Sequence, residues 1–199
     1  MTEPLKTNLW ERFKAFPKIA YLRVRFGIAK KLIQMRNRPP KVLKHPHRKL
    51  KIISESWDFE HSKIQDIVDL LRKMNAALYS MPYGMRLGLA APQIGINKRV
   101  FIMGQRVIVN PEWNPSKAPP NEIVEGCYSV PGRMFKVPRA QYGWAKYQTF
   151  DGKWVEEKLK GLDAIVFQHE LDHLDGKCCI DIGIEQFAKP GVNLKPIQK

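Results

Sequence analysis

The clearest pattern of apolar positions lies between Ser62 and Ser80 and predicts an amphipathic helix. Apolar residues recur there every three or four positions, the spacing that places side chains on one face of a helix. These residues are Ile64, Ile67, Val68, Leu71, Met74 and Leu78. Ser62 and Gln65 have the spacing of a capping box, so we expect Ser62 to cap the helix.

Several short segments after this helix have the composition of β-strands. They are rich in β-branched and aromatic residues and are bounded by residues typical of turns. The segments are 99–103, 106–113, 135–140, 142–150 and 153–161. Asp151 and Gly152 stand between the last two segments, which predicts a hairpin turn.

A second helix is predicted after the last strand. Leu162, Ile165 and Val166 have helical spacing, Asp163 lies near the expected N-terminus, and Gly176 stands where a glycine commonly ends a helix. A helix, several strands and another helix, without β–α–β alternation, predict an α+β fold. We expect mixed or antiparallel sheets around this second helix.

The second helix carries His169, Glu170 and His173 in the order H-E-x-x-H. Residues four positions apart leave the same face of a helix, so both imidazoles can hold one divalent cation. The carboxylate between them can accept a proton from water at the metal. The alternative is a solvated surface helix, but the motif is rare at average composition. We therefore expect a central metal-binding helix.

Basic residues are concentrated at the start of the chain. Residues 1–53 contain 15 Lys and Arg against Glu3 and Glu11, whereas residues 54–199 contain 19 against 17 acidic residues. Apolar residues between these charges predict short basic amphipathic helices within an extension over residues 1–40. Three interpretations of the extension stay open: it packs on the domain, contacts an anionic surface such as RNA or a membrane, or is a targeting peptide.

Cysteine content and hydropathy indicate the compartment. Cys127, Cys178 and Cys179 give no disulfide framework, so a reducing compartment is expected. No segment approaches the roughly 18 apolar residues of a transmembrane helix, and no secretory leader opens the chain. We expect a cytoplasmic protein without a transmembrane segment, and import into an organelle stays open.

A catalytic metal normally has three protein ligands, so the two histidines need a partner. Cys179 is one candidate, because the residues from His169 onward read H-E-x-x-H-x-x-G-x-x-C, as in metzincin proteases but with cysteine as the third ligand. That family requires a methionine turn downstream, whereas the last methionine here is Met134. We expect Cys179 on a strand after the helix, packed in the core. The other candidate is Cys127.

Three segments in this order, "GLAAPQIG" at 88–95, "EGCYS" at 125–129 and "QHELDHLDG" at 168–176, resemble the signature motifs of peptide deformylases. Weaker matches extend the resemblance over residues 41–183. The resemblance implies metal-dependent removal of the N-formyl group from the N-terminal methionine of newly synthesised polypeptides, with release of formate. We therefore expect an extension over 1–40, a catalytic domain over 41–183 and a C-terminal tail over 184–199.

The resemblance also implies the metal site. Its ligands would be Cys127, His169 and His173, with one position left open for water. A thiolate with two imidazoles suits several divalent ions. Fe²⁺ is the expected ion, and Zn²⁺, Co²⁺ and Ni²⁺ are the alternatives.

The same resemblance implies the roles of the residues around the metal. Glu170 would carry the proton from water to the leaving amine, while the Gln93 amide and the Tyr128 N–H would stabilise the oxyanion. Leu87 and Gly88 would bind the substrate backbone as an added strand. A further pair, Glu125 with Arg139, would hold the cysteine loop in place.

Three positions depart from the family pattern. Arg86 replaces a glycine, Tyr128 replaces leucine or glutamate, and Met134 replaces an arginine, with Arg133 beside it. Two other functions are weighed against a deformylase. One is a catalytically inactive deformylase-like binding protein, and the other is a metalloprotease that cleaves unblocked peptides. We also expect the extension over 1–40 to contact ribosomal RNA or another anionic surface, because the extension is strongly basic and the substrate is a nascent chain.

Overall fold

The computed structural model describes residues 39–82, 84 and 86–188 of the 199-residue chain. The expected extension, apart from its last two residues, and residues 189–199 of the expected tail lie outside this range. Among the described residues, no helix is both long and apolar enough to cross a bilayer.

Helix α4 spans Ile64–Ser80 and confirms the amphipathic helix predicted at this place. Its N-cap is Lys63 rather than Ser62, so the expected cap was wrong by one residue. The Asp66 carboxylate accepts a hydrogen bond from the Lys63 N–H at 2.9 Å and satisfies the exposed backbone donor there. The buried residues of the helix are Ile67, Leu70, Met74, Ala77 and Leu78, whereas Ile64 is 40% exposed.

The first sheet in the described part of the chain has five antiparallel strands in the order β1-β2-β3-β6-β7. Their bounds are Gly88–Ala90 for β1, Val100–Met103 for β2, Arg106–Pro115 for β3, Tyr142–Gln148 for β6 and Trp154–Lys160 for β7. Four of these strands coincide with predicted segments. The turn between β6 and β7 confirms the predicted hairpin, because Gly152 has a φ of 82° and its N–H donates to the Thr149 carbonyl at 2.9 Å.

A second antiparallel sheet among the described residues has the order β4-β5-β8. Strand β4 spans Asn121–Cys127, β5 spans Val130–Arg139 and β8 spans Ile184–Ala188. The predicted segment 135–140 lies mostly in β5, while β4 and β8 were not predicted. Strand β8 begins at the first residue of the expected tail. Together with the helices, these sheets confirm an α+β fold with antiparallel pairing.

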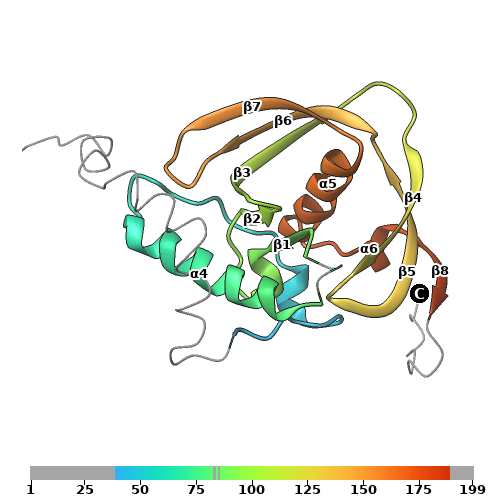
Figure 1. Cartoon of the computed structure of the whole chain (residues 1–199), viewed down its shortest axis with the longest axis horizontal. Helices are drawn as coiled ribbons and strands as arrows, with labels where there is room; N and C mark the ends of the chain where they lie inside the picture. The colour runs from blue at the N-terminus through green and yellow to red at the C-terminus, as the bar shows by residue number, and fades with distance from the viewer. Residues whose placement is uncertain (1–38, 83, 85, 189–199) are drawn as a thin grey trace, which may run out of the picture. The chain divides into compact units, whose positions relative to one another are not determined.

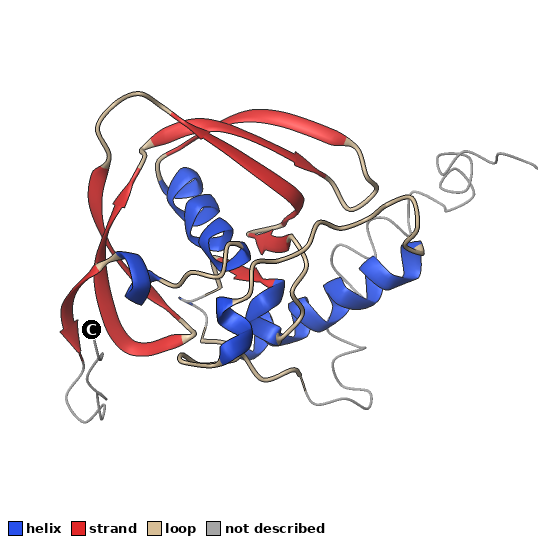
Figure 2. Cartoon of the chain, turned by 180° about the vertical axis from the view of Figure 1, so that it is seen from behind, coloured by secondary structure: helices blue, strands red, loops and turns tan. Residues whose placement is uncertain are grey.

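Helix α5, Leu162–Leu174, lies at the centre of the ribbon, with the strands of both sheets around it (Figures 1 and 2). Phe167 lies on this helix, and the centre of its ring is 5.2 Å from that of Phe101 and 5.4 Å from that of Trp113. Gly176 follows the helix with a φ of 72°, as predicted, and a Cβ there would lie 2.7 Å from the Lys51 carbonyl oxygen. Two polar residues of α5, Glu170 and His173, are buried at this central place.

Cys179 begins the short helix α6, Cys179–Ile182, so the strand expected at this position was wrong. The Asp181 carboxylate accepts from the Cys178 N–H at 2.8 Å, and the Asp181 N–H donates to the Cys178 carbonyl at 2.9 Å. These two bonds favour a helical turn directly after Gly176. The prediction that Cys179 is buried is confirmed.

Candidate active site

Strand β4 and helix α5 bring together three side chains with metal-ligating atoms, which form the candidate metal-binding group. Cys127 is the last residue of β4, while His169 and His173 are one turn apart on α5. One donor atom from each of the three lies within 4.8 Å of the others, and Cys127 Sγ is 3.2 Å from His173 Nε2. The histidine rings stand edge to face at 5.1 Å. Thiolate and imidazole donors at this separation match the chemistry of a transition-metal site.

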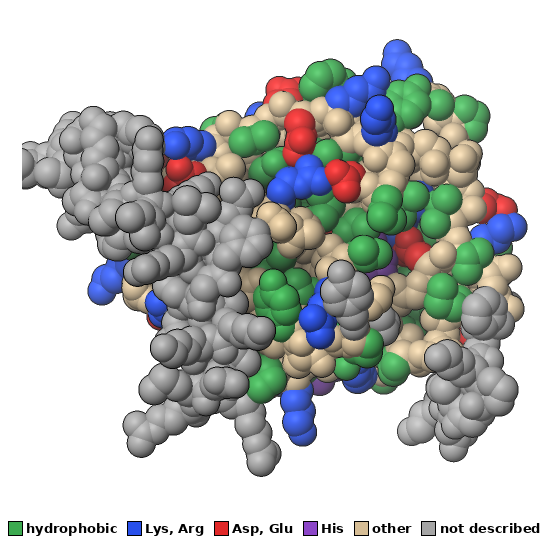
Figure 3. Space-filling view, viewed as in Figure 1, with side chains coloured by type: hydrophobic (Ala, Val, Ile, Leu, Met, Phe, Trp, Pro, Cys, Tyr) green, Lys and Arg blue, Asp and Glu red, His purple; other side chains and the backbone are tan. Residues whose placement is uncertain are grey.

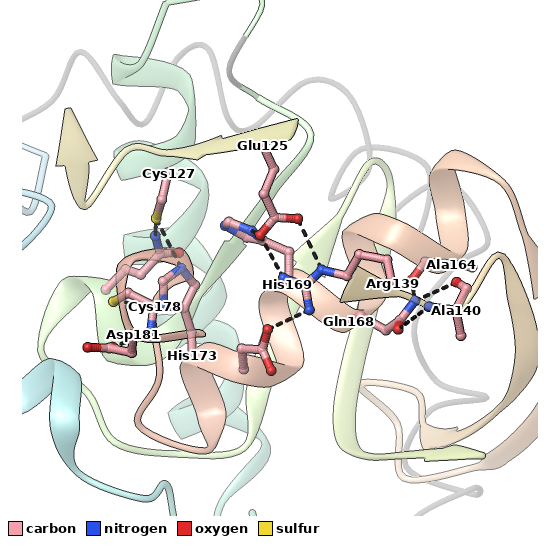
Figure 4. Close-up of polar contacts among 12 residues, drawn as sticks. Glu125, Cys127, Arg139, Ala140, Ala164, Gln168, His169, His173, Cys178 and Asp181 are labelled. Atoms are coloured by element: carbon pink, nitrogen blue, oxygen red, sulfur yellow. Dashed lines mark hydrogen bonds and ion pairs between the residues drawn. The ribbon is translucent and has the colours of Figure 1, made fainter. Parts of the chain in front are cut away.

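A buried polar network fixes the orientation of His169, as Figure 4 shows. Glu125 Oε1 is 3.0 Å from His169 Nδ1, and the Glu125 carboxylate also accepts two hydrogen bonds from Arg139, at 2.6 and 3.0 Å. Arg139 donates a third bond to Asp172 at 2.6 Å. With Nδ1 engaged, His169 presents Nε2 as its remaining donor atom.

The network also shifts the pKa values of its members. Burial acts to raise the pKa of Glu125, but hydrogen bonds from His169 and Arg139 outweigh it and keep that pKa below its usual value. Burial acts to lower the pKa of His169, whereas its bonds with Cys127 and Glu125 raise the pKa to about 10. Glu125 is therefore a stable anion beside the histidine.

Cys127 is surrounded by groups that favour its thiolate form. A hydrogen bond from the Cys179 thiol and the attraction of His173 hold the pKa of Cys127 well below its usual value, although burial opposes them. The Ser129 N–H also donates to Cys127 Sγ at 3.3 Å. On the far side of His173, Nδ1 lies 3.7 Å from Cys178 Sγ. The thiolate is the form of cysteine that binds metals.

Glu170 faces the metal-binding group from a buried position. Its side chain is 4% exposed, and within the described part of the chain its Oε2 atom has no hydrogen-bond partner. Burial raises the pKa of Glu170 to about 7, although the two histidines oppose the rise. Strand β1 lies against it, since a Cβ at Gly88 would be 2.4 Å from Glu170 Oε1. A carboxyl group with this pKa can accept and donate protons near neutral pH.

The Gln93 side chain is held with its amide nitrogen toward the cysteine. Its Oε1 accepts from the Ala90 N–H at 2.8 Å, which leaves Nε2 facing Ser129 Oγ at 3.2 Å and Cys127 Sγ at 3.7 Å. Tyr128, the other expected oxyanion residue, follows Cys127 directly and is partly buried. The structure thus places the Gln93 amide beside the metal-binding group, and Tyr128 adjoins the cysteine of that group in the chain.

Leu87 and Gly88 lie at the edge of the five-stranded sheet. Among the described residues, β1 pairs with β2 alone, and the Leu87 carbonyl accepts from the Gly104 N–H at 3.0 Å. Because polar groups alternate in direction along a strand, those of Gly88 face the unpaired edge. The Leu87 side chain is 50% exposed. On the face shown in Figure 3, a histidine side chain reaches the surface among hydrophobic and acidic ones.

Two of the three departures from the family pattern, Arg86 and Met134, have defined contacts, and so has Arg133 beside the second. Arg86 donates to the Met81 carbonyl at 2.8 Å, and the sulfur of Met134 lies against Gly126, where a Cβ would be 2.8 Å away. Arg133 donates to Glu185 of β8 at 2.7 Å. The Arg133 side chain therefore links β5 to β8 within the second sheet.

Sequence reasoning missed two polar neighbours of the metal-binding group. Asp172 follows His169 by three residues, so the two side chains are neighbours on one face of the helix. This spacing was the available signal that Asp172 would join the network of His169 and Arg139. Cys178 gave no such signal, because its approach to His173 depends on the turn at Gly176. Cys179, considered as a ligand, instead contacts the Cys127 sulfur.

Comparison with known proteins agrees with this site. The family model described as polypeptide deformylase matches residues 39–186. The peptide deformylase of Stutzerimonas stutzeri is 36% identical over 147 residues, which cover 70% of this chain and 84% of the relative. A class I type b peptide deformylase from Acinetobacter baumannii, solved with Met-Ala-Ser bound, is 31% identical and superposes with a TM-score of 0.64. The match covers 71% of this chain and 96% of the Acinetobacter chain.

The Plasmodium falciparum peptide deformylase, solved with an inhibitor, also has a TM-score of 0.64, at 32% identity over 72% of this chain and 88% of that chain. The fold, the Cys/His/His group and these similarities define a metal-dependent hydrolase. The chain belongs to the polypeptide deformylase family. Its activity is the metal-dependent removal of the N-formyl group from nascent peptides.

Proposed function

We propose that Cys127, His169 and His173 hold the catalytic metal ion of this deformylase, and that the ion is Fe²⁺. The observation that carries the proposal is the convergence of one thiolate and two imidazoles within 4.8 Å beside a buried carboxyl group. A sulfur ligand with two nitrogen ligands fits Fe²⁺, and it also fits Zn²⁺, Co²⁺ and Ni²⁺. When bound, such an ion polarises the formyl oxygen and makes water a stronger nucleophile.

Glu170 carries the proton in this proposal. It accepts a proton from the attacking water and delivers it to the amine that leaves when formate is released. Its pKa of about 7 suits both transfers, because neither the acid nor the base form is strongly favoured at neutral pH. The close approach of Gly88 keeps the carboxyl group in one place.

Gln93 and Tyr128 stabilise the oxyanion. The Gln93 carbonyl is engaged by Ala90, so its amide N–H groups are directed to the site, and Tyr128 supplies a main-chain N–H. Donors that are already oriented cost no reorganisation during the reaction. The Glu125–Arg139 pair holds the strand end from which Cys127 and Tyr128 project.

The nascent peptide binds along the edge of β1 as an added strand. The main-chain groups of Gly88 face that edge, and the Leu87 side chain flanks it. The Acinetobacter neighbour was solved with Met-Ala-Ser bound, which supports a peptide as the ligand, whereas the place of binding is inferred from the edge that β1 leaves unpaired among the described residues.

The partners and location of the enzyme are part of the same proposal. A deformylase acts where polypeptides are made, so we assign this one to the cytoplasm, with an organelle that makes its own polypeptides as the alternative. We further assign ribosomal RNA as the partner of the basic extension over 1–40, on the basis of its charge. This extension, apart from its last two residues, lies outside the described part of the chain.

The function is tested with protein loaded with iron in the absence of oxygen. We expect formate release from formyl-Met-Ala-Ser and no internal cleavage of the same peptide without the formyl group. An inactive, metal-loaded protein would indicate a binding protein, and cleavage of the unblocked peptide would indicate a protease. Parallel measurement of bound iron ensures that inactivity does not come from metal loss.

A further inference from the structure

The segment from Leu43 to His45 is hydrogen-bonded to both segments that carry the oxyanion donors. The Leu43 N–H donates to the Gln93 carbonyl and the His45 N–H donates to the Ser129 carbonyl, both at 2.8 Å. Between them, the Lys44 ammonium donates to the Tyr128 carbonyl. The same ammonium lies 3.4 Å from the centre of the Tyr128 ring.

The bond from Lys44 reaches the Cys127 sulfur through a single peptide unit. The Tyr128 carbonyl and the Ser129 N–H belong to the same peptide, and that N–H donates to Cys127 Sγ at 3.3 Å. The contacts therefore run from the ammonium to the carbonyl oxygen, across the peptide to its N–H, and from there to the sulfur. The first and last of these links are direct hydrogen bonds, and the middle one is covalent.

A cation at a carbonyl oxygen polarises the peptide and strengthens its N–H as a donor, because linked hydrogen bonds reinforce one another. A stronger hydrogen bond to a thiolate withdraws electron density from the sulfur. A sulfur that donates less charge leaves a bound metal more electrophilic, which is the property that activates water and the formyl oxygen.

We propose that Lys44 is a positioning residue that acts on the Cys127 sulfur through the Tyr128–Ser129 peptide. It holds this peptide in place and lowers the electron donation of the sulfur to the metal. The inference rests on the proposed function, since it takes Cys127 as a metal ligand. The His45 N–H already attaches the segment to the cysteine loop at Ser129, and the Leu43 N–H attaches it to Gln93, so the Lys44 side chain is not required for that attachment.

The test compares Lys44→Met with Lys49→Met in the full-length chain. Lys49 is a matched control, because its ammonium also donates to a backbone carbonyl, that of Gly95 at 3.0 Å, yet that peptide makes no contact with a ligand sulfur. Both variants lose one positive charge and one lysine–carbonyl bond. The conservative variant Lys44→Arg keeps the charge and the donor.

The main readout is the sulfur-to-metal charge-transfer absorption band of the Co²⁺-substituted proteins. In Lys44→Met the sulfur donates more strongly, so the band should move to longer wavelength, and kcat should fall about 10-fold with little change in KM, the scale typical of residues next to metal ligands. Lys44→Arg should restore both values, and Lys49→Met should leave both unchanged. A purely structural role for Lys44 would lower the thermal stability without moving the band.

Two outcomes would overturn the inference. An unshifted band in Lys44→Met, or an equal shift in Lys49→Met, would show that Lys44 does not act on the sulfur. If the wild-type protein itself lacked the charge-transfer band, Cys127 would not be a ligand, and the proposed metal site would fail together with the inference.

Discussion

Arg139 holds two carboxylates of the active site from a nearly buried position, since its side chain is 4% exposed. Removing it in Arg139→Met leaves Glu125 and Asp172 without their partner in a region of low polarity. Breaking such a buried network typically costs about 3–5 kcal/mol. We expect Arg139→Met to lower the free energy of unfolding by this amount in denaturant titrations.

An exposed ion pair gives the control for Arg139. Lys98 pairs with Glu55 at 2.7 Å on the surface, where the Lys98 side chain is 38% exposed and that of Glu55 is 77% exposed. Exposed pairs contribute about 0–1 kcal/mol, so Lys98→Met should change stability little. Equal losses in the two variants would contradict the special role assigned to Arg139.

The two cysteines considered as metal ligands are separated by substitution. Cys127→Ser replaces a thiolate by a hydroxyl, so metal affinity should fall by more than about 100-fold, beyond the range for residues next to ligands. Cys179→Ser keeps a hydroxyl donor for the Cys127 sulfur and should retain the metal with an activity close to wild type. Metal content is measured by chelator competition. If Cys179→Ser lost the metal and Cys127→Ser kept it, Cys179 would be the third ligand, as in the metzincin-like arrangement.

At the scale of elements, strand β1 places its backbone against the catalytic carboxyl group. In Gly88→Ala the new methyl group would lie 2.4 Å from Glu170 Oε1 and must displace it. A displacement of about 1 Å in an active site can cost about 100-fold in rate. We expect formate release to fall on this scale while the fold and the bound metal are retained.

Gly84→Ala is the matched control for Gly88→Ala. Apart from its chain neighbours, no described residue has a heavy atom within 4 Å of a Cβ built at Gly84, so the added methyl group should be tolerated. Activity close to wild type in both variants would mean that β1 does not constrain Glu170.

Apolar periodicity predicted the positions of helices and strands more reliably than which of these elements lie next to one another. Helices α4 and α5 and the hairpin of β6 and β7 depend on local spacing and turn residues, which a sequence displays directly. Strands β4 and β8 were missed because several of their side chains are exposed, so little apolar alternation marks them. The first-turn cap of α4 was misplaced because Asp66, rather than Gln65, accepts the backbone bond.

The meeting of Cys127 with His169 and His173 is the part of the site that no local pattern contains. The cysteine lies 42 residues before the first histidine, and their proximity depends on where β4 ends relative to α5. The resemblance to a family supplied this contact in advance. By contrast, the Lys44 bond to the Tyr128 carbonyl depends on the path of an irregular segment and could not be predicted.

At the scale of the whole molecule, the basic extension over 1–40 is expected to bind ribosomal RNA. Deleting it should leave hydrolysis of a short formyl-peptide nearly unchanged, because the family model begins at residue 39. Co-sedimentation with ribosomes should weaken. For the intact protein it should also fall steeply with salt, since each phosphate contact releases counterions. No association of the intact protein with ribosomes at low salt would reject this role.

The central claim, that Glu170 carries the proton at a metal held by Cys127, His169 and His173, is tested most directly with Glu170→Gln. Bound iron and formate release are measured on the same oxygen-free preparations of wild type and variant. The ligands are untouched, so the variant should keep its iron, whereas its turnover should fall by two or more orders of magnitude, about the upper range for general acid–base catalysis. Formate release at the wild-type rate from iron-loaded Glu170→Gln would contradict the account.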